Sequence, residues 1–132
     1  NLYPPLMNDI LIDGSVRVGG IEVTAFVQEH GSETSLGYRF GPIAYSTDVS
    51  GLDDAAFAAL AGVEVWIVDC LRERPHPTHS HLEQTLQWIA RVKPARALLT
   101  HMNHQVDYAE FMAHCPPGVE PAFDGMAIEV SG

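Results

Sequence analysis

The chain has few basic residues: 7 Lys and Arg stand against 17 Asp and Glu, so its 132 residues carry a formal net charge of −10. Surfaces that hold nucleic acid or anionic membranes cluster Lys and Arg, so this charge argues against both partners. No apolar run reaches the ~20 residues of a membrane span, and no basic segment followed by an apolar one opens the chain. The 2 cysteines are too few for a disulfide scaffold. We therefore expect one soluble, cytoplasmic domain.

The chain is rich in histidine. All but one of its 7 histidines fall in the second half, at His76, His79, His81, His101, His104 and His114. Neutral imidazole is the commonest metal ligand and the usual proton carrier near neutral pH. The pattern therefore points to metal or proton chemistry, with a polar surface rich in histidine as the alternative.

The first half of the chain is typical of strands without helices. Residues 1–6 carry no cap and no helical period, so we interpret them as a loop. Ile21–Val27 is rich in β-branched and aromatic residues, which favours a strand. Ser35–Phe40 and Pro42–Thr47 have the pattern of the two arms of a hairpin. Asp48 ends this run of predicted strands, which has no helix within it.

The second half alternates strands with helices. Continuous apolar runs that end in a polar residue indicate strands covered on both faces. Capping residues and helical spacing indicate the helices between them. The predicted helices are Leu52–Ala61, one that begins with a capping box at Ser80–Glu83, and Tyr108–His114; the predicted strands are Val63–Val68 and Arg96–Thr100, followed by a hairpin of Val119–Phe123 with Met126–Val130. The order ββββαβαβαββ predicts a compact α/β domain.

Polar residues follow several of these strands directly. His30, Asp48, Asp69 and His101 each stand at the end of a predicted strand, and loops beyond strand ends are where α/β proteins place their sites. Two imidazoles and a carboxylate can ligate zinc, manganese or non-haem iron. A carboxylate can also bridge two cations, which favours Asp48 as the shared ligand of a two-metal centre. Each of these residues could instead simply form a turn.

Three segments together resemble a known family. His30–Phe40, Ala44–Asp48 and Leu98–His101 match, in order and spacing, the C-terminal half of a metallo-β-lactamase-fold hydrolase. The chain is most similar to the phosphodiesterase branch, which includes the phosphonate-operon cyclic phosphodiesterases and, more distantly, ribonuclease Z. The resemblance implies a four-layer αββα sandwich, of which residues 1–132 would form the C-terminal part.

The resemblance also implies roles for individual residues. His30 resembles a ligand of the first metal ion, Asp48 the bridging aspartate and His101 a ligand of the second ion. His79 resembles the histidine of this branch that contacts the scissile phosphate. The implied reaction is attack of a hydroxide bridging two divalent cations, zinc or manganese, on a small cyclic or nucleotide-like phosphodiester. A net charge of −10 makes transfer RNA the less favoured substrate.

One departure from the family pattern is large. The family's first metal motif, His-x-His-x-Asp-His, supplies most ligands and is missing here. The sole His-x-His is His79-Ser80-His81, and Leu82-Glu83 follows where Asp-His would stand. We therefore expect the full-length protein to be a binuclear hydrolase and this chain alone to be inactive, with the N-terminal half removed, disordered or on another chain.

Several alternatives stay open on the sequence alone. His104 competes with His101 as the last ligand, and His81 competes with His79 as the phosphate contact. Asp69 could orient a ligand histidine. The chain could be a non-catalytic half-domain that self-associates into a homo-oligomer through the face that the missing half would cover. It could also be a simple metal-binding module built from His76, His79, His81 and His104.

Overall fold

The computed structural model describes Met7 and residues 10–131, so the loop predicted for residues 1–6 lies outside the described part. The elements follow the order ββββαβαβαβ. They are β1 (Ser15–Val18), β2 (Ile21–His30), β3 (Glu33–Phe40), β4 (Ile43–Ser46), α1 (Asp54–Leu60), β5 (Val65–Asp69), α2 (Leu82–Val92), β6 (Arg96–Thr100), α3 (Tyr108–His114) and β7 (Val119–Pro121). Within the described residues, no helix has the length and apolar character that a membrane crossing requires.

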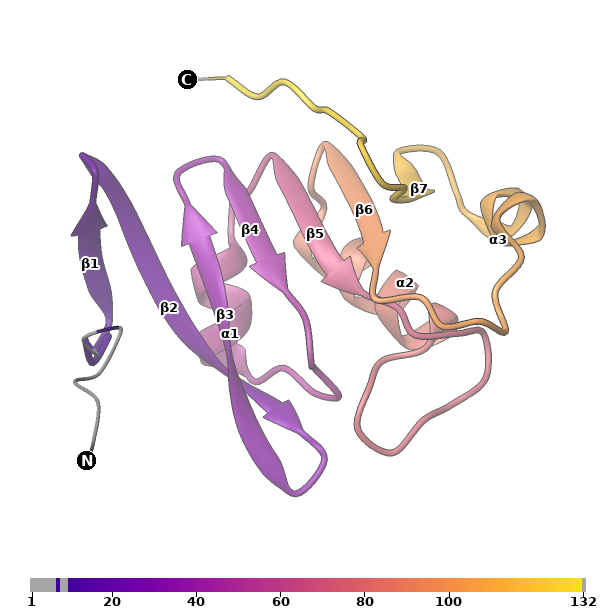
Figure 1. The fold of residues 1–132 in the computed structure, drawn as a ribbon, viewed down its shortest axis with the longest axis horizontal. Coiled ribbons are helices and arrows are strands. Elements are labelled where there is room, and N and C mark those ends of the chain that lie inside the picture. The colour runs from indigo at the N-terminus through magenta and orange to yellow at the C-terminus, as the bar shows by residue number, and fades with distance from the viewer. Residues whose placement is uncertain (1–6, 8–9, 132) are drawn as a thin grey trace.

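All seven strands form one sheet in sequence order. Neighbours from β1 to β4 are antiparallel and joined by tight turns, whereas β4 to β7 are parallel. Parallel neighbours need a crossover, and α1, α2 and α3 supply one each. Helices α1 and α2 lie behind the sheet in Figure 1, and α3 lies beside its β7 edge. The result is an α/β arrangement of a sheet with α1 and α2 on one face and α3 at one edge.

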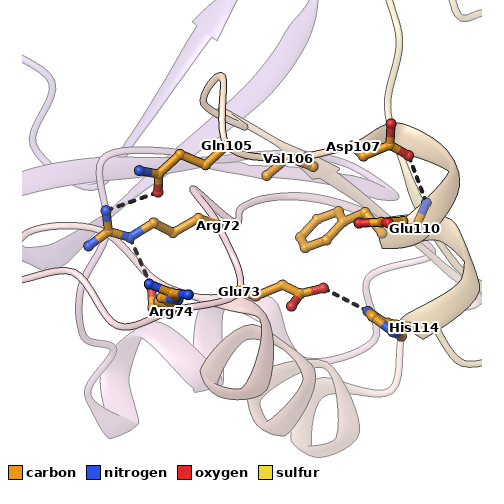
Figure 2. A pocket seen from close by; sticks show the side chains of 9 residues that line it. Arg72, Glu73, Arg74, Gln105, Val106, Asp107, Glu110 and His114 are labelled. Atoms are coloured by element: carbon orange, nitrogen blue, oxygen red, sulfur yellow. Dashed lines mark hydrogen bonds and ion pairs between the residues drawn. The ribbon is translucent and has the colours of Figure 1, made fainter.

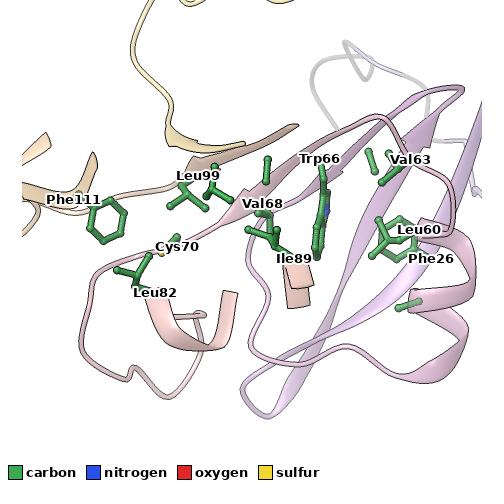
Figure 3. Close-up of a cluster of buried hydrophobic side chains, with 14 residues drawn as sticks. Phe26, Leu60, Val63, Trp66, Val68, Cys70, Leu82, Ile89, Leu99 and Phe111 are labelled. Atoms are coloured by element: carbon green, nitrogen blue, oxygen red, sulfur yellow. The ribbon is translucent and has the colours of Figure 1, made fainter. Parts of the chain in front are cut away.

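The hydrophobic core lies between the sheet and these helices. Trp66 and Val68 of β5 alternate with outward residues and point to the helix side, where Leu60 of α1 and Ile89 of α2 meet them (Figure 3). Trp66 is fully buried, and its indole Nε1–H donates to the Ser46 hydroxyl at 3.1 Å. The core therefore fixes β4 and β5 against both helices, and so fixes the loops that leave their ends.

The other face of the sheet is apolar and open. Val18, Ile21 and Val27 point to this face and are 60%, 58% and 57% exposed. Ile12, Val16, Val18, Ile21, Val23, Tyr38 and Phe40 line a shallow hollow of about 370 Å³ there. Exposed apolar patches of this kind mark surfaces that bind another layer or partner. We call this surface the open sheet face.

Two predictions about local structure are wrong. Helix α2 has His81 as its N-cap residue, with no side-chain capping bond. The Ser80 hydroxyl instead donates to the Asp69 carbonyl at 2.6 Å, so the capping box predicted at Ser80–Glu83 does not form. The Asp69 carbonyl at the end of β5 is buried and needs a hydrogen-bond donor. The Ser80 hydroxyl is that donor, and it therefore does not cap α2.

The predicted hairpin near the C-terminus is also wrong. Strand β7 is only Val119–Pro121, and it pairs in parallel with β6. Residues 126–130 form no strand, although a turn at residues 124–125 does form. The free edge of β6 offers its backbone groups to β7, and Pro121 limits how far that strand can extend.

Candidate active site

Three imidazoles converge on the carboxylate of Asp48 at one end of the sheet. His30 ends β2, Asp48 follows β4, His101 follows β6, and His79 lies in the loop of residues 70–81 between β5 and α2. The Oδ1 atom of Asp48 lies 3.7 Å from His101 Nε2, 4.0 Å from His30 Nε2 and 3.9 Å from His79 Nδ1. The fold thus brings together the four residues to which the resemblance assigned roles.

Two of these residues have an uncommon backbone conformation. Asp48 has φ +54° and His101 has φ +63°, in the left-handed region that side chains other than glycine rarely adopt. Among the described residues, Lys93 is the one other non-glycine in this region, and it caps the C-terminus of α2. Strained residues of this kind cluster at functional sites, where the surrounding fold holds them in place. The backbone therefore marks Asp48 and His101 independently of their side-chain chemistry.

The hydrogen bonds of the imidazoles fix which nitrogen each presents. His30 Nδ1 lies 2.7 Å from the Thr78 carbonyl oxygen, which can only accept, so Nδ1 carries the proton. His79 Nδ1 likewise donates to the Asp69 carboxylate, at 2.9 Å. Both rings therefore keep Nε2 for a ligand or a substrate.

Asp69 is held firmly in the protein interior. Its side chain is 0% exposed, and its Oδ2 accepts from the backbone N–H of Val49 at 3.2 Å in addition to His79. Its Oδ1 has no partner among the described residues. The carbonyl of Asp69 accepts from the Ser80 and Thr85 hydroxyls. A buried carboxylate fixed on this many sides orients His79, the role that the sequence left open for Asp69.

The donor atoms fit a divalent cation. One ligand atom each from His30, Asp48 and His79 lie within 4.8 Å of one another. Donors that share a tetrahedral ion at about 2.1 Å lie about 3.4 Å apart, so the distances of 4.0 Å from His30 Nε2 and 3.7 Å from His101 Nε2 to Asp48 Oδ1 need only a small contraction. His79 belongs to this tightest group, whereas the sequence assigned His101 to the metal and His79 to the phosphate. His101 Nε2 is nevertheless the nitrogen nearest to Asp48 Oδ1.

The remaining histidines of the second half do not join this group. His81 is the half-buried N-cap of α2, and His104 is exposed in the loop after β6. The ring of His76 lies 5.3 Å from that of His79, centroid to centroid, and its pKa is lowered by partial desolvation and by the nearby Arg72. Within the described part of the chain, the four-histidine module of the sequence alternatives is therefore not assembled.

A separate cavity of about 350 Å³ lies between the start of the loop of residues 70–81 and helix α3 (Figure 2). The Arg72 guanidinium donates to Gln105 Oε1 and to the carbonyls of Arg74 and Pro75, so each of its three nitrogens already makes a hydrogen bond. Across the cavity His114 pairs with Glu73 at 2.6 Å. These contacts tie the loop to its surroundings and leave the cavity without an assembled site.

The cysteines take no part in this chemistry. Cys70 is fully buried after β5, and burial raises the pKa of its thiol to about 12, against a smaller lowering by the hydrogen bond with Thr85. Burial also raises the pKa of Cys115. A thiol that stays protonated is a poor nucleophile and a poor metal ligand. Both cysteines are free.

Comparison with known proteins places this geometry in a family. Residues 4–102 match the family model described as "Beta-lactamase superfamily domain". The chain is 26% identical over 132 residues to the octanoyltransferase of Porphyromonas gingivalis (strain ATCC BAA-308 / W83), covering 96% of this chain and 27% of that protein.

Two solved structures share the fold. A diphosphatase from the PhnP family is 31% identical with a TM-score of 0.88, covering 92% of this chain and 48% of that one. The short form of human tRNase Z is 18% identical with a TM-score of 0.70, covering 89% of this chain and 46% of that one. The chain thus spans about half of each solved structure and about a quarter of the octanoyltransferase.

The matched residues 4–102 contain β1 to β6, His30, Asp48, Asp69, His79 and His101. The match therefore includes every side chain that converges on Asp48, together with the strands that position them. The predicted resemblance to the metallo-β-lactamase fold is confirmed, and the chain belongs to the beta-lactamase superfamily.

Proposed function

We propose that the full-length protein containing this chain is a metal-dependent hydrolase of small phosphodiesters. The observation that carries the proposal is the convergence of His30, His79 and His101 on the Asp48 carboxylate, with distances of 3.7–4.0 Å. Divalent ions held by such a donor set activate water and share the charge that develops on a phosphoryl group. Zinc and manganese both suit imidazole and carboxylate ligands.

In this proposal the four side chains have different roles. His30 and His101 would hold the ions through Nε2, and Asp48 would be the ligand common to both. His79 contacts the scissile phosphate and either stabilises charge on the phosphoryl oxygens or protonates the leaving oxygen. Asp69 keeps the proton of His79 on Nδ1 and stabilises the ring when it is charged.

We further propose that a segment outside this sequence completes the site. Three or four ligands are too few for two ions that each take four or more. The chain covers 48% of the related diphosphatase, and its open sheet face exposes apolar residues that a second layer would bury. In this view the additional segment contributes the missing ligands and covers the open sheet face, so the 132-residue chain alone lacks activity.

The net charge of the chain narrows the range of substrates that we expect. A net charge of −10 repels a large polyanion, whereas bound cations offset that charge locally for a small substrate. We therefore favour a small cyclic or nucleotide-like phosphodiester over transfer RNA. The scarcity of basic residues also fits a protein that works in the cytoplasm without a membrane partner.

The direct test uses the full-length protein loaded with zinc or with manganese. Hydrolysis of bis(4-nitrophenyl) phosphate and of a 2′,3′-cyclic nucleotide should depend on added metal and on Asp48. The Asp48→Asn variant should lose metal, measured by elemental analysis, and activity together. The exposed His104→Ala variant is the matched control and should keep both. Full activity of Asp48→Asn, or turnover after complete chelation, would contradict the proposal.

A second candidate function follows from the open sheet face. Val18, Ile21 and Val27 are more than half exposed there, and such a surface favours self-association. A homo-oligomer of the isolated chain, measured by light scattering, would disperse when Val27 and Leu36 are replaced by Thr. If the isolated chain stays monomeric, this alternative is wrong.

A further inference from the structure

Gln28 is a polar residue in the protein interior, two residues before His30 on β2. It is 1% exposed and is among the largest fully buried side chains. Its Oε1 has no hydrogen-bond partner in the part of the chain that the structure describes. A buried acceptor without a partner costs free energy, so stability alone does not explain a glutamine here. The contacts of its amide nitrogen give a better explanation.

The hydrogen bonds of Gln28 lead in one direction, toward Asp48. Its Nε2 donates to the Thr47 carbonyl at 3.2 Å and to the hydroxyl of Ser35, its partner across β2 and β3, at 3.1 Å. The Ser35 hydroxyl in turn donates to the Asp48 carbonyl at 2.7 Å. Both carbonyls can only accept, so the amide must present its N–H₂ group, and not its oxygen, to the Thr47 carbonyl.

These bonds fix the backbone on both sides of the Asp48 Cα atom. The φ and ψ angles of a residue describe the relative orientation of the two peptide planes that flank it. The Thr47 carbonyl lies in the plane before Asp48 and is held by Gln28. The Asp48 carbonyl lies in the plane after it and is held by Ser35, and the N–H of that same plane donates to Asp69 Oδ2 at 3.2 Å. The sheet therefore imposes the φ of +54° at Asp48.

This backbone conformation sets the position of the Asp48 carboxylate. Its Oδ1 lies 4.0 Å from His30 Nε2 and 3.7 Å from His101 Nε2. The side chain of Asp48 is 48% exposed, so packing does little to orient it. A relaxation of φ to the ordinary negative range would turn the Cβ atom away from both imidazoles. The aim of the carboxylate therefore depends on the bonds that hold the two peptide planes.

The other side of the Gln28 amide lies against β3. A Cβ atom at Gly37 would lie 2.6 Å from Gln28 Oε1 and would also meet the ring of Phe26. Gly37 pairs with Phe26 in the register of β2 and β3. The close approach at this glycine leaves room for the amide and keeps its nitrogen directed at the loop that carries Asp48.

We propose that Gln28 is a positioning residue for metal binding, which holds the Asp48 carboxylate in place through the Thr47 carbonyl and, by way of Ser35, through the Asp48 carbonyl. The inference rests on the proposed function, because it takes Asp48 as a metal ligand. Loss of these bonds lowers metal affinity, since the ligand is no longer preorganised. In the metal-free protein the lost bonds are offset by relaxation of the strained φ and by removal of the unpartnered Oε1.

The test measures the zinc affinity of the full-length protein by competition with a chromophoric chelator. Gln28→Met keeps the length of the side chain but has no N–H donor, and it should raise the zinc dissociation constant about tenfold. Ser35→Ala should also weaken binding, whereas Ser35→Thr keeps the hydroxyl and should bind zinc like the wild type. Thr24→Val is the matched control on the same strand, because it removes a hydrogen bond to Ser15 and should leave zinc affinity unchanged.

A second measurement separates positioning from a general loss of structure. The free energy of unfolding in urea is measured on the metal-free protein, because bound zinc would itself stabilise the fold. Gln28→Met should lower it less than Leu60→Ala, which removes a core side chain between α1 and the sheet. Leu60→Ala should nevertheless keep its zinc affinity.

Unchanged zinc affinity in Gln28→Met would overturn the inference. Equal losses of affinity in Gln28→Met and Leu60→Ala, or in Ser35→Ala and Ser35→Thr, would also overturn it, and the Ser35 pair decides alone if Gln28→Met does not fold. Zinc-dependent hydrolysis of bis(4-nitrophenyl) phosphate that persists in those cases would leave the proposed function standing. Zinc affinity that depends on Gln28, in a wild-type protein without any turnover, would support the inference and refute the proposed function.

Discussion

Replacing Asp69 by Asn tests whether the charge of this buried carboxylate supports the proposed role of His79 in hydrolysis. The Asp69 side chain is 0% exposed and accepts hydrogen bonds from His79 Nδ1 and from the backbone N–H of Val49. An asparagine keeps the shape and can still accept, but it carries no charge to stabilise an imidazolium. It also places a buried amide N–H₂ where an oxygen stood, and Oδ1 already lacks a partner among the described residues.

The size of the effect follows from these contacts. A hydrogen bond to a charged group contributes about 1.5–3 kcal/mol, and each 1.4 kcal/mol is a factor of ten. Replacing the partner of a site histidine typically costs about tenfold to hundredfold in activity or metal affinity. We therefore expect Asp69→Asn in the full-length protein to lower kcat by about that factor, with a smaller change in KM.

The assay is metal-dependent hydrolysis of bis(4-nitrophenyl) phosphate, with the unfolding midpoint in urea measured in parallel. Ser80→Ala is the matched control, because the Ser80 hydroxyl donates to the Asp69 carbonyl and not to its carboxylate. It should cost about 1 kcal/mol of stability and leave kcat nearly unchanged. If Asp69→Asn keeps full activity, or if Ser80→Ala loses as much of it, the reasoning about His79 is refuted.

Three further predictions concern the supporting structure. Burial raises the pKa of the Cys70 thiol from 9.0 to about 12, so the stability that it contributes is complete below pH 9 and is lost as the pH rises toward 12. Cys70→Ala should therefore flatten the fall in unfolding free energy over that range. An unchanged slope would show that Cys70 does not cause the fall. A Cβ on Gly31, whose φ is +64°, would lie 2.6 Å from Thr78 Cγ2. Gly31→Ala should lower the free energy of unfolding by about 1–2 kcal/mol for its backbone alone, and it should weaken metal binding by displacing the Thr78 carbonyl from His30. Adding Thr78→Ser, which removes that methyl group, should recover part of the metal affinity in a titration. Leu60 is 0% exposed in the core between α1 and the sheet, so Leu60→Ala should lower the unfolding free energy by about 2–5 kcal/mol in urea denaturation, whereas a loss near zero would mean that α1 is not part of the cooperative core.

The sequence predicted the strand ends well because buried strands have a strong local signal. Val65–Asp69 and Arg96–Thr100 are short apolar runs bounded by polar residues, and both form strands close to the predicted bounds. Their parallel pairing brings the residues that follow them to one edge of the sheet, which is why His101 lies near Asp48. The resemblance to the superfamily then supplied roles that spacing alone could not.

The conformation of the loop of residues 70–81 could not be predicted by the same reasoning. It has no periodicity, and its conformation depends on distant partners, such as His30 for the Thr78 carbonyl and Gln105 for the Arg72 guanidinium. The wrong capping box has the same origin, because Ser80 satisfies the Asp69 carbonyl across the fold rather than the helix beside it. Tertiary hydrogen bonds of this kind override local signals wherever a buried group must be satisfied.

Asp48 and His101 show how the fold itself supports the proposed chemistry. Both residues have positive φ angles, a conformation that costs free energy for any residue other than glycine. The neighbouring contacts oppose that cost: the Asp48 carbonyl accepts from the Ser35 hydroxyl at 2.7 Å, and the Thr100 carbonyl, just before His101, accepts from the Cys70 backbone N–H at 3.0 Å. Glycine at either position would relieve the strain but would remove a carboxylate or an imidazole. Contacts from Ser35 of β3 and from Cys70, which follows β5, hold this strained backbone and keep the two side chains 3.7 Å apart. A ligand between the side chains explains this arrangement better than turn formation does.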